Sequence, residues 1–189
     1  MDEDRLRAVT VGELNPFGTK VVVEDYDPRW PDLFEEERAS IASALGGRAL
    51  AIDHTGSTSV PGLPAKPVID ILLQVADSAD EPTYVPDLER AGYVQRIREP
   101  DWFEHRMLCR RTELGAPHDA NLHVFSPRHA AAEIARVLAF RDWLRTHDDD
   151  RDRYAATKRD LARRDWKYVQ DYADAKSEIV EEILAKALR

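Results

Sequence analysis

The chain has 189 residues, of which 43% are hydrophobic, and it carries a formal net charge of −9. This length suits one compact domain that can bury roughly 70% of the surface exposed by the unfolded chain, so its core needs no disulfide or metal. The acidic balance excludes a broad nucleic-acid-binding surface but leaves room for a local basic pocket for one small anion. Because Cys109 is the single cysteine, an intramolecular disulfide is impossible, which fits a reducing compartment.

The N-terminal and apolar segments give no sign of export or membrane insertion. The first residues, MDEDRLRAV, are rich in acids and lack the apolar stretch of a secretory signal. The longest apolar run, residues 68–75, is far too short to span a bilayer. The sequence therefore predicts a soluble, cytoplasmic protein without a membrane partner.

Strand and helix patterns are mixed in the first two thirds of the chain. Residues 1–20 predict a loose leader, because they contain turn-forming residues without periodicity. A helix is predicted from Asp27, which can cap it ahead of Pro28, to the glycine pair at 46–47. Apolar and alternating runs predict further elements, namely strands at 21–25, 48–55, 66–75, 94–99, 103–111 and 120–126 and a helix at 81–92.

From residue 128 onward the pattern is helical only. Helices are predicted over 128–147, 150–164 and 166–189. Mixed strands and helices followed by helices alone indicate an α+β fold. We therefore divide the chain into a leader (1–20), an α+β core (21–127) and C-terminal helices packed on the core (128–189).

The segment 53–75, DHTGSTSVPGLPAKPVIDILLQV, has the strongest functional pattern. Its turn at Gly56 and Ser57, with Thr58 following, can present backbone N–H groups and hydroxyls to phosphate oxygens. It is not a P-loop, because no lysine follows the second glycine. Many nucleotidyltransferases instead place a Gly-Ser turn shortly before a strand with carboxylates at alternate positions, which hold Mg²⁺. Here Asp70 has the expected spacing, but the alternate position is Leu72.

At this point the sequence resembles the GrpB family. The string HTGSTSVPGLPAKPVIDILLQV is similar to a string that members of this family carry, and NLHVF (121–125), AFRDWLR (139–145), YAATKRDLA (154–162) and YADAK (172–176) resemble later family blocks, in order. The resemblance implies a nucleotidyltransferase-like mixed β-sheet core with helices and a C-terminal helical region. The resemblance also implies that an apolar residue at Leu72 departs from working transferases and not from GrpB proteins.

Histidines stand where working transferases of this superfamily have a further carboxylate. Alternation in NLHVF places His123 on one side of its strand, where it can bind a divalent metal or act as a general base. With Asp70 and His54, it forms a candidate metal set, and His105 is a weaker candidate. We expect a divalent ion, Mg²⁺ or Mn²⁺ or else Zn²⁺, and two imidazole ligands would favour a transition metal over Mg²⁺. The alternative is that each histidine only hydrogen-bonds a neighbouring loop.

Each C-terminal helix carries one cation on its apolar stripe: Arg141, Lys158 and Lys176. These cations, with Lys66, can converge near the Gly56 turn and neutralise phosphates. The alternative for the three helical cations is that their apolar stems pack on the core while the charged heads reach water. Lys66 can equally be an ion-pair partner of Asp70.

These patterns support one leading hypothesis and two alternatives. The leading hypothesis is metal-dependent nucleotidyl or phosphoryl transfer to a small acceptor, with Asp70 and His123 as catalytic residues and a nucleotide or other phosphorylated small molecule as partner. The first alternative is a nucleotide- or anion-binding module without transferase activity, which Leu72 favours. The second is a metal–histidine hydrolase. Ser57 and Ser59 show no His/Asp partnership in the sequence, so acyl transfer is not predicted.

Overall fold

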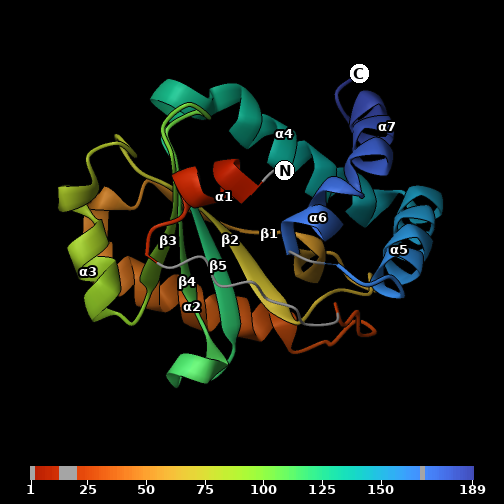
Figure 1. Cartoon of the computed structure of the whole chain (residues 1–189), viewed down its shortest axis with the longest axis horizontal. Helices are drawn as coiled ribbons and strands as arrows, with labels where there is room; N and C mark the ends of the chain where they lie inside the picture. Colours follow the sequence, from red (N-terminus) through yellow and green to blue (C-terminus); the bar gives the residue numbers. More distant parts are fainter. Residues whose placement is uncertain (1–2, 13–20, 167–168) are drawn as a thin grey trace.

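The protein is built around one mixed β-sheet (Figure 1). The computed structural model describes residues 3–12, 21–166 and 169–189. Within these ranges five strands pair in the order β1-β2-β5-β4-β3, and only β2 and β5 run parallel to each other. The strands are β1 (Ala51–Thr55), β2 (Val68–Gln74), β3 (Val94–Glu99), β4 (His105–Arg110) and β5 (Asp119–Phe125).

One face of the sheet is covered by two helices that bury the main core. Helix α2 (Trp30–Leu45) packs on β1 and β2, and helix α3 (Val85–Arg90) packs against β3 and α2. The odd-numbered apolar residues of β2 point into this core, as strand alternation requires. Ile69, Ile71 and Leu73 are each 1% exposed or less. The positions between them, including Asp70, therefore point to the opposite face.

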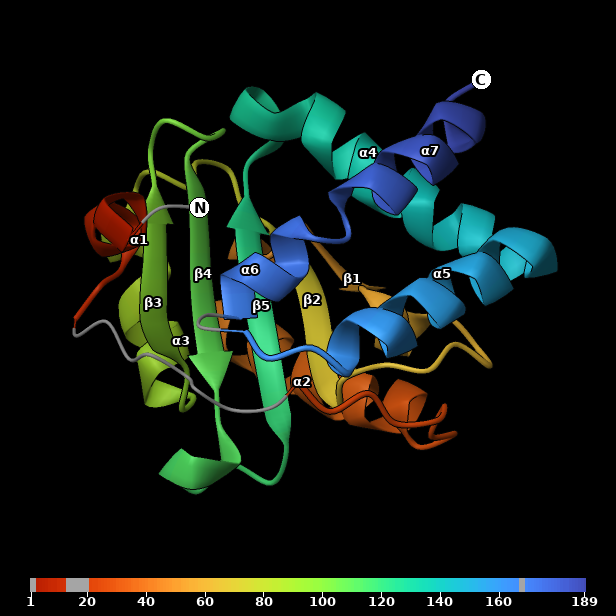
Figure 2. The ribbon, with the colours of Figure 1, turned by 45° about the vertical axis from the view of Figure 1, so that its right-hand side comes forward.

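The C-terminal helices lie on the other side, at the β1–β2 end of the sheet (Figures 1 and 2). Helix α4 (Pro127–Thr146) contacts β1 and β5 and packs on α5 (Asp148–Ala162) and α7 (Ser177–Ala187). The short helix α6 (Val169–Asp174) crosses in front of β5 in Figure 2. A second apolar cluster joins this helical group to the segment after β1, through Val60 and Leu63. The α+β fold with a C-terminal helical region, predicted from the sequence, is confirmed.

The structure differs from the predicted elements in three places. Residues 3–9 of the predicted loose leader form helix α1 (Glu3–Val9), which lies against β3, while residues 13–20 lie outside the described residues. The predicted strand at 21–25 is reduced to one bridge between Glu24 and Ala65. The predicted last helix is divided, because α6 ends at Asp174 and α7 begins at Ser177. No helix among the described residues is both long and apolar enough to cross a membrane.

Candidate functional site

The Gly56 turn and Asp70 are in direct contact. Gly56 follows β1 with a φ of 64°, a conformation that favours glycine. A Cβ atom at this position would lie 2.3 Å from Oδ2 of Asp70, so only glycine lets the turn approach the carboxylate so closely. Thr55, the last residue of β1, pairs with Asp70 on β2 and donates a hydrogen bond from Oγ1 to its carbonyl oxygen at 3.2 Å. The sequence therefore holds turn and carboxylate together through a strand pair.

A hydrogen-bonded chain leads from Asp70 to the far side of β5. Asn121 is the partner of Asp70 in the parallel pair, and its Nδ2 donates to Oδ1 of Asp70 at 2.9 Å. Arg111, just after β4, donates from Nη2 to Oδ1 of Asn121 at 2.6 Å. The amide of Asn121 thus has a fixed orientation, with its donor towards Asp70. Where a working transferase would carry another acid, this site has a neutral amide and, at position 72, a buried leucine.

Positive charge surrounds Asp70 without a direct ion pair. Burial raises the pKa of the Asp70 carboxyl, whereas the bond from Asn121 and the charges of Lys176, Lys66 and Arg111 act to lower it. Burial in turn lowers the pKa of the Lys66 and Lys176 ammonium groups, which the Asp70 charge opposes. Across the described residues, none of these cations lies within ion-pair distance of the carboxylate. The local charge balance is therefore positive.

Lys176 lies at the break between α6 and α7. It is the residue before the first turn of α7, and its Nζ lies 4.5 Å from the centroid of the Tyr172 ring on α6. A cation at the N-terminal end of a helix adds to the positive end of the helix dipole. This placement therefore adds to the positive potential around Asp70.

Lys158 lies beneath the turn, where it contacts Ser57. Its side chain comes from α5 and the residue is 2% exposed. Its Nζ donates to the carbonyl oxygen of Pro64 and lies 2.9 Å from Oγ of Ser57. The Tyr154 ring lies on the same helix, with its centroid 4.7 Å from Nζ. Burial, followed by the charge of Lys176, lowers the pKa of Lys158 to about 6.

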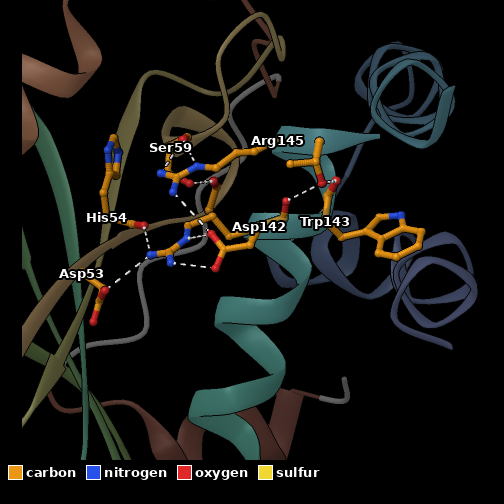
Figure 3. Close-up of polar contacts among 9 residues, drawn as sticks. Asp53, His54, Ser59, Asp142, Trp143 and Arg145 are labelled. Carbon is orange, nitrogen blue, oxygen red and sulfur yellow. Dashed lines mark hydrogen bonds and ion pairs between the residues drawn. The ribbon is translucent and has the colours of Figure 1, made fainter. Parts of the chain in front are cut away.

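Two arginines of α4 form hydrogen bonds and an ion pair that connect this helix to β1 and to the turn (Figure 3). Arg145 donates from Nε and Nη2 to the carbonyl oxygen of Ser59 at 3.0 and 2.9 Å. Arg141 donates to the carbonyl oxygen of His54 at 3.1 Å and forms ion pairs with Asp142 and Asp53. Most of the hydrogen-bonding capacity of Arg141 is therefore used within the protein. Its predicted role in phosphate binding stays a prediction.

A small cavity borders the turn where it faces the C-terminal helices. Its volume is about 160 Å³, and residues of the turn and of helices α4, α5 and α7 line it. The lining is mainly apolar, with Phe140 and Leu144 from α4 and Leu184 from α7. Gly56 and Ser57 line it too, and so does Arg141. The Gly56–Ser57 turn is therefore shared between an apolar cavity and the positively charged surroundings of Asp70.

Comparison with known proteins decides the family. Residues 20–186 match the family model described as GrpB protein. The chain belongs to the GrpB family. A UPF0157 protein of Halalkalibacterium halodurans is 58% identical over 185 residues, which cover 98% of this chain and 91% of that protein. A UPF0157 protein of Streptomyces coelicolor is 40% identical over 172 residues, which cover 91% of this chain and 87% of that protein.

A solved GrpB structure shares the fold. The conserved protein GrpB from Enterococcus faecalis superposes with a TM-score of 0.76 at 31% identity, covering 88% of this chain and 97% of that one. The nucleotidyltransferase-like α+β core is thus shown for this GrpB protein. A dephospho-CoA kinase of Mycolicibacterium paratuberculosis is 31% identical over 163 residues, but the match covers 73% of this chain and only 39% of that enzyme.

The predicted histidine set is not brought together with Asp70. His54 lies on the opposite face of β1, where its ring stacks on Phe34 with centroids 4.6 Å apart and its Nε2 is 3.0 Å from Oγ1 of Thr58. Thr58 also donates to the carbonyl oxygen of Val68 at 3.2 Å, so both side chains are used in holding the turn on the core. Burial, and then the charges of Arg145 and Arg141, lower the pKa of His54 to about 4.

His123 shares a face with Asp70 but has another partner. In β5 it pairs with Leu72, and its Nδ1 is 3.1 Å from Nε2 of His105. His105 in turn contacts Oε2 of Glu99 through Nδ1 at 2.7 Å. Burial lowers the pKa of His123 to about 3, so its imidazole is neutral at physiological pH. Within the described ranges, no three His, Cys, Asp or Glu side chains are placed to hold a metal ion.

Sequence reasoning found the turn, Asp70 and the lysines but missed three participants. Asn121, Arg111 and Tyr154 complete the surroundings of the turn. For Asn121 a signal existed, because strand alternation puts it on the same face as His123. For Arg111 and Tyr154 no signal existed, since their contacts depend on how β4 and α5 pack.

Proposed function

We propose that this GrpB protein binds a phosphorylated small molecule, with a nucleotide as the leading class, at the positively charged surroundings of Asp70. The observation that carries this proposal is the charge balance: the Lys66, Lys176 and Arg111 cations act on one carboxylate. Partly buried ammonium groups are costly unless an anion compensates them. A phosphate between the lysines would restore their pKa values and supply the missing negative charge.

A nucleotide is favoured over free phosphate by the fold and by one group of relatives. The Gly-Ser turn ahead of a strand carboxylate is the arrangement that nucleotidyltransferase-like folds use for nucleotides. Mycobacterial proteins named dephospho-CoA kinase contain a segment similar to this chain. Dephospho-CoA is therefore a reasonable member of a ligand panel.

Metal-dependent nucleotidyl or phosphoryl transfer is a second candidate. It is favoured by the contact of the Gly56 turn with Asp70, which would put a phosphate next to a metal-binding acid. The residues fit one Mg²⁺ brought in with the nucleotide, held by Asp70 and the phosphates. They do not fit a pair of metals, because Leu72 and Asn121 replace the further acids.

A thermal-shift experiment tests both candidates. Pyrophosphate, ATP and dephospho-CoA are each added with EDTA, Mg²⁺ or Mn²⁺. A ligand at a hundred times its dissociation constant stabilises the fold by about 2.7 kcal/mol. We expect stabilisation by at least one nucleotide, strongly reduced in Lys176→Met. The matched control is Lys186→Met on the same helix, whose ammonium pairs with Asp150 instead.

The outcomes separate the candidates. Stabilisation that persists in EDTA supports binding without transfer. Stabilisation that requires a metal and disappears in Asp70→Asn supports the transferase. Millimolar pyrophosphate and nucleotides that leave the melting temperature unchanged would contradict both.

A further inference from the structure

The contact between Ser57 and Lys158 is a feature that phosphate binding does not explain. Lys158 is almost completely buried, whereas Ser57 is one of the residues that line the cavity. Of these two residues, Ser57 is therefore the one that borders a space that a ligand can enter. A lysine used for phosphate neutralisation would be expected to reach that space itself.

The geometry fits a serine with a lysine base. The Ser57 Oγ to Lys158 Nζ distance is 2.9 Å, within the range for proton transfer. The carbonyl oxygen of Pro64 accepts a hydrogen bond from Nζ and fixes its position. A neutral amine held in this way still has a lone pair for the Ser57 hydroxyl. Serine–lysine pairs of this kind replace the Ser-His-Asp triad in some hydrolases.

The charge state of Lys158 is compatible with this role. Burial lowers the pKa of Lys158 to about 6, so at neutral pH its side chain is a neutral amine in most molecules. The groups that face it are Tyr154 and Arg159 on α5, Asp70 on β2 and Lys176 before α7. Tyr154 keeps its own proton, because burial raises its pKa to about 12. Lys158 is therefore the group beside Ser57 that can accept a proton.

We propose that Ser57 is a nucleophile and Lys158 its general base, acting on esters or thioesters with a short apolar acyl group. Oγ attacks the carbonyl carbon while its proton passes to Nζ. The bond from carbon to the leaving alkoxide or thiolate then breaks, and the leaving group takes the proton from Nζ. Water releases the acyl group from Oγ in a second, equivalent step.

The size and the apolar lining of the cavity suit a short apolar acyl group. Its volume of about 160 Å³ is close to that of engineered cavities that hold benzene. Its lining by Val60, Phe140 and Leu144 suits an acyl chain of a few carbons. Hydrolysis of p-nitrophenyl butyrate and labelling by an alkyl fluorophosphonate are therefore suitable probes. In the labelling reaction Oγ bonds to phosphorus and fluoride leaves.

The experiment compares labelling rates and sites in the full chain. We expect one label per chain, located by mass spectrometry on Ser57 and absent from Ser57→Ala. The matched control is Ser59→Ala, a hydroxyl of the same turn that donates to the Gly56 carbonyl oxygen at 2.6 Å. This variant should still be labelled. The pyrophosphate shift, assigned to Lys66 and Lys176, is measured separately on the wild-type chain. A Ser57 label without that shift, or the shift without a label, shows which of the two proposals fails.

Two variants of Lys158 separate a base from a point charge. Lys158→Met should fold, because it keeps the apolar stem, and should slow labelling at least about 100-fold. Lys158→Arg keeps a positive charge but cannot accept a proton at neutral pH, so it should be equally slow. In the wild type the rate should rise with pH around a midpoint near 6. Absence of a Ser57 label, or a Lys158→Arg rate equal to that of the wild type, overturns the proposal.

Discussion

Two carboxylates on opposite faces of the sheet have opposite surroundings. Glu37 on α2 is 1% exposed. Its carboxylate lies 2.9 Å from Nη1 of Arg110 and 3.0 Å from Nε2 of His118, and it accepts a hydrogen bond from the hydroxyl of Tyr93. Asp70, in contrast, has cations nearby but accepts a side-chain hydrogen bond from the neutral amide of Asn121. Among the described residues, the negative charge of Glu37 thus has ion-pair partners within the chain, whereas the charge of Asp70 has none within ion-pair distance.

The difference separates an acid whose charge is compensated within the fold from the acid of the candidate site. A buried charge that already has its partners contributes to the fold and has nothing left to bind a ligand. A carboxylate with unpaired cations around it keeps both charges available to a ligand. By this criterion Glu99, His105 and His123 resemble Glu37, because these three side chains already contact one another.

The comparison predicts that Glu37→Ala and Asp70→Asn have very different effects on stability. Glu37→Ala should lower the free energy of unfolding by about 3–5 kcal/mol, since it leaves the half-buried Arg110 and the buried Tyr93 hydroxyl without their partner. Asp70→Asn should change it by no more than about 1 kcal/mol. The fold raises the pKa of Asp70, which means that its ionisation at neutral pH does not favour folding. Urea unfolding at pH 7 measures both, and equal losses would contradict the distinction.

Gly56→Ala tests whether the close approach of the turn defines the site. Gly56 and Gly62 both have positive φ values, 64° and 77°, so alanine at either position costs about 1–2 kcal/mol. Only at Gly56 does the new Cβ meet Asp70, whereas at Gly62 nothing lies within 4 Å. We expect Gly56→Ala to be destabilised by about 3 kcal/mol in total and to lose ligand stabilisation. Gly62→Ala is the control and should keep binding.

The pH dependence of stability tests the structural role of His54. Its pKa falls from an ordinary 6.5 to about 4 on folding, so below pH 6.5 the unfolded chain binds a proton that the folded chain does not. The stability from this residue is therefore complete above pH 6.5 and is lost as the pH falls towards 4. Between pH 7 and 5 the loss should be about 2 kcal/mol.

His54→Gln, followed by urea unfolding at both pH values, measures this contribution. The variant should reduce the stability difference between pH 7 and pH 5 by about the same amount. An unchanged pH dependence in His54→Gln would show that the imidazole is not held neutral by the core.

The sequence predicted the fold better than the site. The continuous apolar run around VIDILLQ predicted a strand central to the sheet, and the glycine pair at 46–47 correctly predicted the end of α2. The break at Lys176 was missed, because residues 166–189 keep a helical apolar period across it. The predicted metal set placed His54 with Asp70, but His54 pairs with Ile71 and takes the opposite face of the sheet, which the sequence of one strand does not show. The Ser57–Lys158 contact joins residues 101 positions apart, which no local pattern encodes.

The parallel pairing of β2 with β5 has a consequence for the order of folding. The bond from Asn121 to Asp70 connects residues 51 positions apart, whereas β4 and β5 form a nearby antiparallel hairpin. Loop closure makes long-range pairing slower than hairpin formation. Early intermediates are therefore expected to contain the hairpin while Asp70 and Asn121 are still separate. The proposed affinity for a phosphorylated ligand would then arise only once β2 and β5 pair.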